Sequence, residues 1–441
     1  MKKIALYVSV LAISGLVAGA GPKPLGAGHE QGEILIVFSG NTLGELKPCG
    51  CAKEEDQGGI ERRMSYLKSV AKRAKDRLLL DTGDSFKEPS VQGRLKASTL
   101  MEAMAAMNYD AVGLGDHDLV YGNRFLEEAR GIPWISANME IGKLVLAPHR
   151  IKQYPGGLKA AVVGLADPDL FYVDGHGNFK IGDPLLAARA KVAALKASHA
   201  PDLVVLLTHM NRDKAIELLG IEGVDVVING HIENDTDPGN MTPVRRKGKI
   251  LVQPGPRGQK MGELLVRIDP AGKKSFEHRM VRLDSSVQFD PEMVKLYAAY
   301  NEKVEALFFA SLSEKRNNSD KEIYATEAVC KTCHPGAHKV WSESRHGRAY
   351  ATLARVHKAF DPECLACHVM GWNQPGGFVS EVDTPELKNV QCEVCHGPGR
   401  EHANAPAPGF GRKAQQACAG CHVKNHSPRF KYSDYWPKIK H

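Results

Sequence analysis

The sequence predicts a layered α/β domain followed by a mostly α-helical, loop-rich domain. In the first two thirds of the 441-residue chain, short apolar runs alternate with helical patterns, which is typical of a sheet covered by helices. After about Glu327 the apolar runs become few, while His, Gly and Pro become frequent and a Cys-x-x-Cys-His unit occurs four times. This change in composition indicates two domains of different construction.

Six apolar runs in the first part are predicted to be buried strands. They are 34–38, 78–81, 110–114, 160–166, 203–209 and 224–230. Helical patterns lie between them, for example at 59–76 and 94–107. Two further runs, 250–255 and 262–269, are separated by a turn that contains Gly and Pro, and we expect them to form a hairpin.

The domain boundaries follow from the same patterns. We expect the α/β domain at 33–284, a connecting helix and linker at 290–326, and the second domain at 327–441. Asp290 can cap a helix that has Pro291 at its first position. The second domain has so few apolar side chains that they could hardly form a core by themselves.

The first 20 residues predict a secretory signal peptide. A positive start is followed by the apolar run 4–17 and by small residues at 18–20, and the alternative is an uncleaved anchor. No other segment is long and apolar enough to span a bilayer. The chain is therefore expected to be exported, to the periplasm or to the cell surface or extracellular space. Its net charge of +7 is assigned to solvated residues, because an exported chain rarely meets nucleic acid.

The four Cys-x-x-Cys-His units predict four haem c groups. They are Cys330, Cys333 and His334; Cys364, Cys367 and His368; Cys392, Cys395 and His396; and Cys418, Cys421 and His422. Two thiols at this spacing can bond to the two vinyl groups of one haem, and the adjacent histidine then reaches the iron. Structural zinc is the competing interpretation, because it also uses Cys-x-x-Cys pairs.

Four haems in so short a segment would fill its interior and lie close enough to pass electrons among themselves. Redox proteins are then the expected partners, and haem-to-haem self-association is a further hypothesis. This segment resembles the tetrahaem cytochrome c family typified by the electron acceptor of hydroxylamine oxidation. The matching segments are 330–353, 364–378, 390–402 and 417–422.

The resemblance implies a distal histidine for three of the haems. They are His346 for the haem held by His396, His402 for the haem held by His334 and, by looser analogy, His441 for the haem held by His422. In that family the second haem can be five-coordinate, so the haem held by His368 is the candidate open site. His357 or His426 could fill this position instead, and the sequence leaves that choice open.

Polar side chains follow several strands of the predicted sheet. They are Asp81 and Asp84, then Asp116, His117 and Asp118, and finally His209 and His231. Sites in α/β domains form at the carboxyl ends of strands, and Asp and His are ligands that a divalent transition metal takes. Any one of them could instead be a cap or turn residue. Together they raise the prospect of one divalent metal in this domain.

The α/β domain resembles the calcineurin-like metallophosphoesterases, in particular the UshA-type 5′-nucleotidase branch. The matching segments are 58–67, 78–86, 109–119, 202–209, 224–231 and 251–264. The resemblance implies a metallophosphoesterase-like sandwich and two adjacent metals that cleave phosphate esters. The predicted fold class is therefore an α/β layered metallophosphoesterase-like sandwich, followed by a mostly α-helical, loop-rich multihaem cytochrome c domain.

This copy departs from the family pattern at three motifs. Asn41 and Leu43 replace an Asp-x-His pair, Asp116 replaces an Asn, and Glu233 replaces the second His of Gly-His-x-His. One metal position keeps a plausible ligand set, and its members are Asp84, Asp116, His209 and His231. The other would depend on weak oxygen donors, so a one-metal or metal-free domain is expected. His117 would be catalytic only if the domain hydrolyses phosphate esters.

Cys49 and Cys51 follow the altered first motif. Metal binding, redox chemistry, a bond to another molecule and two buried thiols are all open interpretations.

For the whole chain we expect an exported electron-transfer protein with a non-hydrolytic phosphoesterase-like domain. The alternatives are a bifunctional protein that retains 5′-nucleotidase-like activity, an oxidoreductase that acts at the haem held by His368 or at the Cys49/Cys51 pair, and a structural conductor of stacked subunits.

Overall fold

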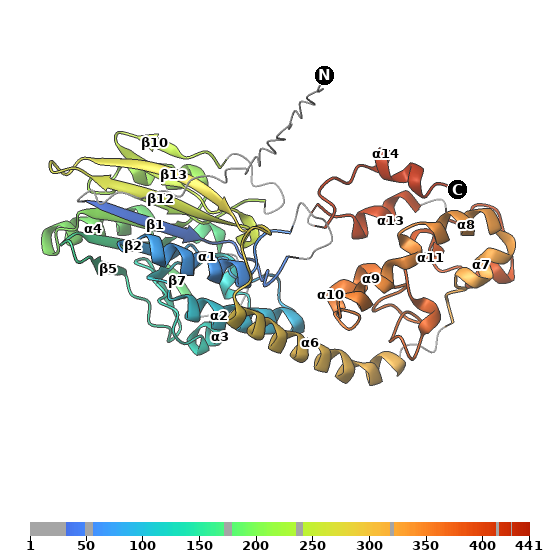
Figure 1. Cartoon of the computed structure of the whole chain (residues 1–441). Coiled ribbons are helices and arrows are strands. Elements are labelled where there is room, and N and C mark those ends of the chain that lie inside the picture. The colour runs from blue at the N-terminus through green and yellow to red at the C-terminus, as the bar shows by residue number, and fades with distance from the viewer. Residues whose placement is uncertain are drawn as a thin grey trace, which may run out of the picture.

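The computed structural model describes residues 32–48, 56–171, 179–234, 241–317, 322–411, 414–424 and 426–441. The predicted signal peptide and the pair Cys49 and Cys51 lie outside these residues. Figure 1 shows the two predicted parts, an α/β domain (blue to yellow) and a helical domain (orange to red), with a long helix that reaches from one to the other.

Two sheets build the first domain. One has the strand order β13-β12-β1-β2-β3, and the other has the order β10-β11-β9-β8-β6-β5. The first sheet consists of β1 (Glu33–Ser39), β2 (Arg77–Asp81), β3 (Ala111–Val112), β12 (Lys260–Ile268) and β13 (Lys274–Arg282). The second consists of β5 (His149–Gln153), β6 (Lys159–Ala166), β8 (Leu203–His209), β9 (Val226–Asn229), β10 (Val244–Arg246) and β11 (Lys249–Val252). A separate pair is formed by β4 (Met139–Ile141) and β7 (Phe179–Ile181).

The two sheets pack face to face and helices cover their outer faces. Because side chains alternate across a strand, Ile34, Ile36 and Phe38 of β1 enter the cluster between the sheets, while Leu35 and Val37 enter the cluster under the helices. The covering helices are α1 (Ile60–Arg73), α2 (Val91–Met107) and α3 (Asn123–Glu128) on the first sheet, and α4 (Pro184–Ser198) and α5 (Arg212–Glu217) on the second. The predicted layered sandwich is confirmed.

All six predicted strands are present, but the predicted hairpin of 250–255 and 262–269 is wrong. Strand β11 pairs in parallel with β9 in one sheet, whereas β12 pairs with β1 and β13 in the other. The Gly- and Pro-containing segment between them therefore carries the chain from one sheet to the other. Both strands are apolar enough to be buried, so their local pattern does not reveal which neighbour each one takes.

Helix α6 (Pro291–Asn317) packs on both domains. Its expected cap is present, because the Asp290 carboxylate accepts hydrogen bonds from the first turn. Tyr300 and Val304 enter the core of the α/β domain, while Phe308 and Leu312 enter the core of the helical domain. Within the segment 290–326, which was expected to hold a connecting helix and a linker, the helix continues to Asn317, so the link between the domains is largely a continuous helix.

The second domain is built from short helices. They are α7 (Glu327–Cys333), α8 (Pro335–Glu343), α9 (Ala349–Arg355), α10 (Pro362–His368), α11 (Cys392–His396), α12 (Arg400–Asn404), α13 (Ala414–Cys421) and α14 (Tyr432–Tyr435). Contrary to expectation, this domain has an apolar cluster of its own, around Leu365, Met370 and Phe378 and completed by α6. Beyond Val390, however, no apolar side chain is buried among the described residues.

None of the helices in the described part of the chain combines the length and the apolar character that a membrane crossing requires.

Candidate functional site

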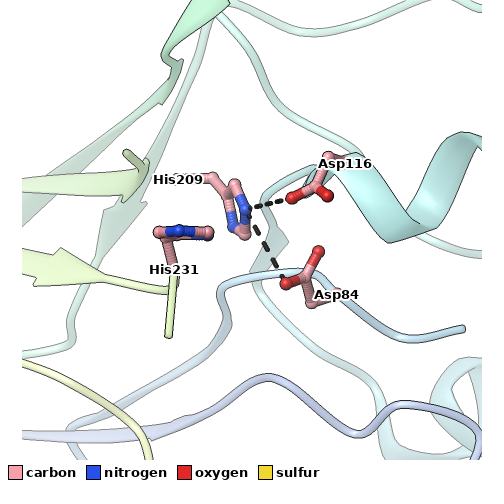
Figure 2. Close-up of side chains that lie close together, drawn as sticks. All are labelled: Asp84, Asp116, His209 and His231. Carbon is pink, nitrogen blue, oxygen red and sulfur yellow. Dashed lines mark hydrogen bonds and ion pairs between the residues drawn. The ribbon is translucent and has the colours of Figure 1, made fainter. Parts of the chain in front are cut away.

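The polar residues predicted at strand ends converge at one edge of the two sheets (Figure 2). Asp84 follows β2 and Asp116 follows β3 in the first sheet, while His209 ends β8 and His231 follows β9 in the second. One ligand atom from each of these four residues lies within 4.8 Å of the others. We call these four residues the metal cluster. Parallel strands place their carboxyl ends together, which brings these distant parts of the sequence to one point.

His209 lies at the centre of the metal cluster. Its Nε2 is 2.8 Å from Oδ1 of Asp116 and 3.7 Å from Oδ2 of Asp84, as the dashed lines in Figure 2 show. Its ring centre is 5.2 Å from that of His231. The Nδ1 atoms of both histidines are buried and have no hydrogen-bond partner in the described structure. Buried nitrogen and carboxylate donors that face one another suit a divalent cation.

The charges of the metal cluster are mutually dependent. Burial disfavours the charged form of His209, but the carboxylates of Asp84 and Asp116 outweigh it and raise its pKa to about 9. Burial followed by the neighbouring His209 lowers the pKa of His231 to about 4. Burial also raises the pKa of Asp84. The positive charge of protonated His209 thus partly neutralises the negative charge of the two carboxylates. A bound cation would neutralise that charge instead.

Asp118 and Asp81 lie outside the metal cluster and stabilise the loops around it. The Asp118 carboxylate accepts backbone hydrogen bonds from Asp84, Ser85 and Gly115 at 2.8–2.9 Å. Burial, then the charge of Asp84, raises the pKa of Asp118 to about 7. The Asp81 carboxylate accepts hydrogen bonds from the Gly83 N–H and from a serine hydroxyl. These two candidates therefore hold Asp84 in place.

The altered first motif is folded against the metal cluster but offers no equivalent ligands. The N–H of Asn41 donates to the Gly83 carbonyl at 2.8 Å, and the N–H of Leu43 donates to the Asp84 carbonyl at 3.0 Å. Asn41 is 2% exposed, and its Nδ2 lacks a hydrogen-bond partner among the described residues. Glu233 is exposed and does not join the cluster. The altered first motif therefore lies against Asp84, but Leu43 has no ligand atom and Glu233 lies outside the cluster.

Two further residues frame this site. His117 is half-buried next to the cluster, with its N–H 3.2 Å from Oδ1 of Asp84 and its Nε2 3.9 Å from Asp116. Sequence reasoning missed Arg63, which is fully buried and donates from Nη2 to Thr42 of the altered first motif at 2.9 Å. The only signal for Arg63 in the sequence was that it directly follows another arginine in a helix that packs on the core.

The histidines of the helical domain form three facing pairs. Ring centres are 6.4 Å apart for His334 and His402, 6.2 Å for His346 and His422, and 5.7 Å for His396 and His441. With metal–imidazole bonds of about 2 Å, two histidines on opposite sides of one iron have ring centres about 6 Å apart. All three spacings fit a haem iron between the rings.

Only one pair matches the expected partners. His402 faces His334 as the resemblance implied. The other two are exchanged, because His346 faces His422 rather than His396, and His441 faces His396 rather than His422. The chain end reaches the third unit because α13 packs beside α11, and this arrangement depends on how the helices pack rather than on sequence spacing.

Among the described residues, the histidine of the second unit has no facing imidazole. Nδ1 of His368 donates to the Ala349 carbonyl of α9 at 2.7 Å, which leaves Nε2 free for a metal on the other side. The structure records no aromatic ring close to the His368 ring among the residues that it describes. His357 is exposed after α9, and His426 lies near charged residues of both domains, including Glu45 and Glu363.

Other residues orient these histidines and were not foreseen. Nδ1 of His422 lies 2.9 Å from the Ser427 hydroxyl, and Nδ1 of His396 donates to a carbonyl at 3.3 Å. Phe410 and Phe430 stack parallel to the rings of His402 and His422, at centre distances of 4.6 and 4.7 Å. Such contacts hold an imidazole in one orientation for its metal.

The cysteines place the four units in a row. The Cys330 side chain contacts Cys392, Cys395 lies near Cys418, and Cys421 contacts Cys367. The spatial order is therefore first, third, fourth and second unit, which differs from their order in the chain. All eight of these thiols are free of disulfides.

Comparisons with known proteins divide the chain in the same way. The family described as "Cytochrome c554 and c-prime" matches residues 329–397. Cytochrome c-554 from Nitrosomonas europaea is 27% identical over 25% of this chain and 64% of its own length. The apyrase of Aedes aegypti is 24% identical over 61% of this chain and 54% of its own length.

A solved structure supports the fold of the first domain. The 5′-nucleotidase precursor from Thermus thermophilus has a TM-score of 0.55 at 23% identity, over 62% of this chain and 59% of that one. The chain joins a 5′-nucleotidase-like domain to a cytochrome c554-like domain. Both predicted resemblances are confirmed. The chain spans about half of the apyrase and under two thirds of the cytochrome.

Proposed function

We propose that this chain is an exported multihaem c-type cytochrome that transfers electrons through four covalently bound haems, and that its α/β domain no longer hydrolyses phosphate esters. The observation that carries the proposal is the spacing of the three histidine pairs, each of which leaves room for one iron. The absence of buried apolar side chains in the described residues beyond Val390 supports it, because a porphyrin in each unit would supply the missing interior.

The row of cysteine contacts gives the proposed relay its order. When bound, each haem would supply an iron that takes up and releases one electron. The thiols of the first, third, fourth and second units approach one another in that order and would hold the haems of neighbouring units. Cys333 of the first unit is exposed, and Cys364 of the second lies beside the α/β domain. The relay would thus run between the domain junction and an exposed surface.

Iron ligation by the three facing pairs is part of the proposal. His402, His346 and His441 would be the distal ligands of the haems held by His334, His422 and His396. The haem held by His368 would keep an open position, because no imidazole faces it in the described structure. Redox proteins are the proposed partners, with haem-to-haem contact between copies of this chain as a further arrangement, and no nucleic acid is involved.

Intact-mass measurement of the mature protein tests the haem content. Expressed with a functional cytochrome c maturation system, the protein should carry the mass of four haems and lack the first 20 residues. Its oxidised spectrum should combine low-spin haems with one high-spin haem from the open position. A colourless protein, or one without added porphyrin mass, would refute the proposal, and retention of the leader would refute processing of a signal peptide.

Replacement of His346 tests the exchanged pairing. We expect His346→Ala to convert the haem held by His422 from low spin to high spin, because His346 faces that histidine. His441→Ala should instead affect the haem held by His396. Paramagnetic NMR of the two variants, with the haems assigned through Cys→Ala variants of each unit, distinguishes these effects. The opposite assignment would restore the pairing expected from the resemblance.

For the α/β domain we propose a single divalent metal held by the metal cluster. Nε2 of His209, which faces both carboxylates, the buried and unpartnered Nδ1 of His231, and the carboxylates of Asp84 and Asp116 fit such an ion. When bound, the metal would neutralise the two carboxylates and polarise a ligand. The residues that would hold a second metal are missing, and in-line displacement by a two-metal site needs both ions. The intact cluster keeps the bifunctional phosphohydrolase as the second candidate.

A further inference from the structure

The two proposed sites are joined by a short path through the domain junction. Nε2 of Gln92, in the first turn of α2, donates to Oδ1 of Asp361 at 2.9 Å and to the Tyr300 hydroxyl at 3.1 Å. Gln92 is 8% exposed and Asp361 is 5% exposed. One turn further along α2, Lys96 forms an ion pair of 2.5 Å with Glu363. Buried polar contacts such as that between Gln92 and Asp361 fix the geometry of a junction.

On the cytochrome side, the junction contacts the helix that carries the second haem unit. Asp361 is the N-cap of α10, and its carboxylate accepts the N–H of Glu363 at 3.1 Å. This short helix contains both cysteines and the histidine of that unit. Cys364 is partly buried next to Asp361, and Lys96 is among the charges that act on it. A displacement of the α10 cap therefore reaches the attachment point of the haem held by His368.

On the other side, the path begins at a residue of the metal cluster. Asp84 is separated from α2 only by residues 85–90, and Ser90 caps that helix by accepting the Gly93 N–H at 2.8 Å. Phe86 in this segment is fully buried and packs edge-on against Phe125 at 5.2 Å. Phe86 fixes the start of this segment in the core, whereas residues 87–90 are exposed and Ser90 fixes its end on α2. Only six residues therefore connect a shift at Asp84 to the start of α2.

We propose that metal binding at the metal cluster is coupled to the redox state of the haem held by His368 through Gln92 and Asp361, which makes the α/β domain a metal-responsive control unit for the electron relay. The inference rests on the proposed metal and haem sites. A bound cation adds positive charge at one end of the path, and the reduced iron carries one positive charge fewer than the oxidised iron. Metal binding should therefore favour the reduced haem.

The coupling is reciprocal by thermodynamic linkage. If the metal raises the affinity of this haem for an electron, reduction must raise the affinity for the metal by the same factor. We expect a factor of about five, at the low end of typical coupling between sites. For a one-electron couple, at about 59 mV per tenfold change, this factor equals an upward shift of about 40 mV.

The experiment uses the full-length holoprotein with Mn²⁺ as the probe. The dissociation constant of Mn²⁺ is measured by calorimetry with the haems oxidised and with them reduced, and haem potentials are measured by spectroelectrochemistry with and without Mn²⁺. We expect about fivefold tighter binding to the reduced protein. The Cys364→Ala/Cys367→Ala variant, which lacks the haem held by His368, should bind Mn²⁺ equally in both states.

Gln92→Leu tests the route. This near-isosteric change removes the amide that joins α2 to the α10 cap, and the coupling should fall below about twofold while Mn²⁺ still binds. Arg316→Gln is the matched control, because it removes the paired contact with Asp383 between α6 and the cytochrome domain and leaves Gln92 and Asp361 unchanged. This variant should retain the fivefold difference in Mn²⁺ affinity. If Gln92→Leu does not fold, Lys96→Met tests the adjacent contact in the same way.

Failure of the coupling is distinguishable from failure of the sites. Mn²⁺ binding that is lost in His209→Ala but has equal strength in both redox states would overturn the coupling and leave the metal site intact. Full coupling in both Gln92→Leu and Lys96→Met would overturn the proposed route. No Mn²⁺ binding to the unmodified protein would overturn the metal site together with the coupling.

Discussion

Replacing Cys392 and Cys395 by alanine should remove one haem and divide the electron relay in two. The third unit lies between the first and the fourth, because Cys392 contacts Cys330 and Cys395 lies near Cys418. Without its haem, no neighbouring group would connect the haem held by His334 to the other two. We expect electrons introduced at the second unit to reach the haem held by His422 and to stop there.

This result can be measured by flash reduction. A ruthenium photoreductant is attached to a cysteine introduced at exposed Val356, at the end of α9 and near the second unit. Transient absorbance then follows the arrival of the electron at each haem. The matched control is Cys330→Ala/Cys333→Ala, which also lacks one haem but keeps the remaining three contiguous. Equal relay lengths in the two variants would contradict the spatial order of the units.

Restoring three motif residues should turn the α/β domain into a phosphohydrolase. The changes are Asn41→Asp, Leu43→His and Glu233→His, which rebuild the ligands of a second metal. The backbone N–H groups of Asn41 and Leu43 already donate hydrogen bonds to the carbonyls of Gly83 and Asp84 at 2.8 and 3.0 Å. The new side chains would therefore lie beside the metal cluster. Two metals can activate a water and stabilise the charge that develops on phosphate, an effect of several kcal/mol. We expect turnover at least a hundredfold above background.

Phosphate release from a 5′-nucleotide and from p-nitrophenyl phosphate, with Mn²⁺ or Zn²⁺ present, measures the gain. The unmodified chain should show no turnover, and adding His209→Ala to the triple variant should abolish the new activity. If the unmodified chain hydrolyses these substrates and loses the activity in His209→Ala, the bifunctional alternative is correct and the proposed loss of hydrolysis is wrong.

Local sequence patterns predicted most of the helices and strands. They did not predict which strands pair with each other, because tertiary packing decides that. The six buried strands and the Asp290 cap follow from periodicity and from a hydrogen bond within one turn, both of which depend on adjacent residues. The hairpin of 250–255 and 262–269 failed because either apolar strand could pair in either sheet. Similarly, the polar end of α6 reads as a linker, yet it continues as a helix beside the cytochrome domain, where Arg316 pairs with Asp383.

For the candidate sites, too, the residues could be predicted, whereas their partners in space could not. The residue types at the strand ends indicated the region of the metal cluster. The family resemblances then implied its four members and the three histidines that face proximal ones. They could not assign His346 and His441 to their partners, because a distal histidine comes from wherever another helix happens to pack. Gln92 and Arg63 carried no motif, since their roles depend on partners far away in the chain.

By itself, the sequence determined the two fold classes and the chemistry available at each site, because these depend on side-chain periodicity and on thiols, imidazoles and carboxylates at short, fixed spacings. Only the tertiary structure decided which histidines face each other, in what order the four units lie, and that α2 connects Asp84 to the α10 cap. Those relations join residues distant in the chain, and they are set by the shape and burial of whole elements rather than by any local pattern.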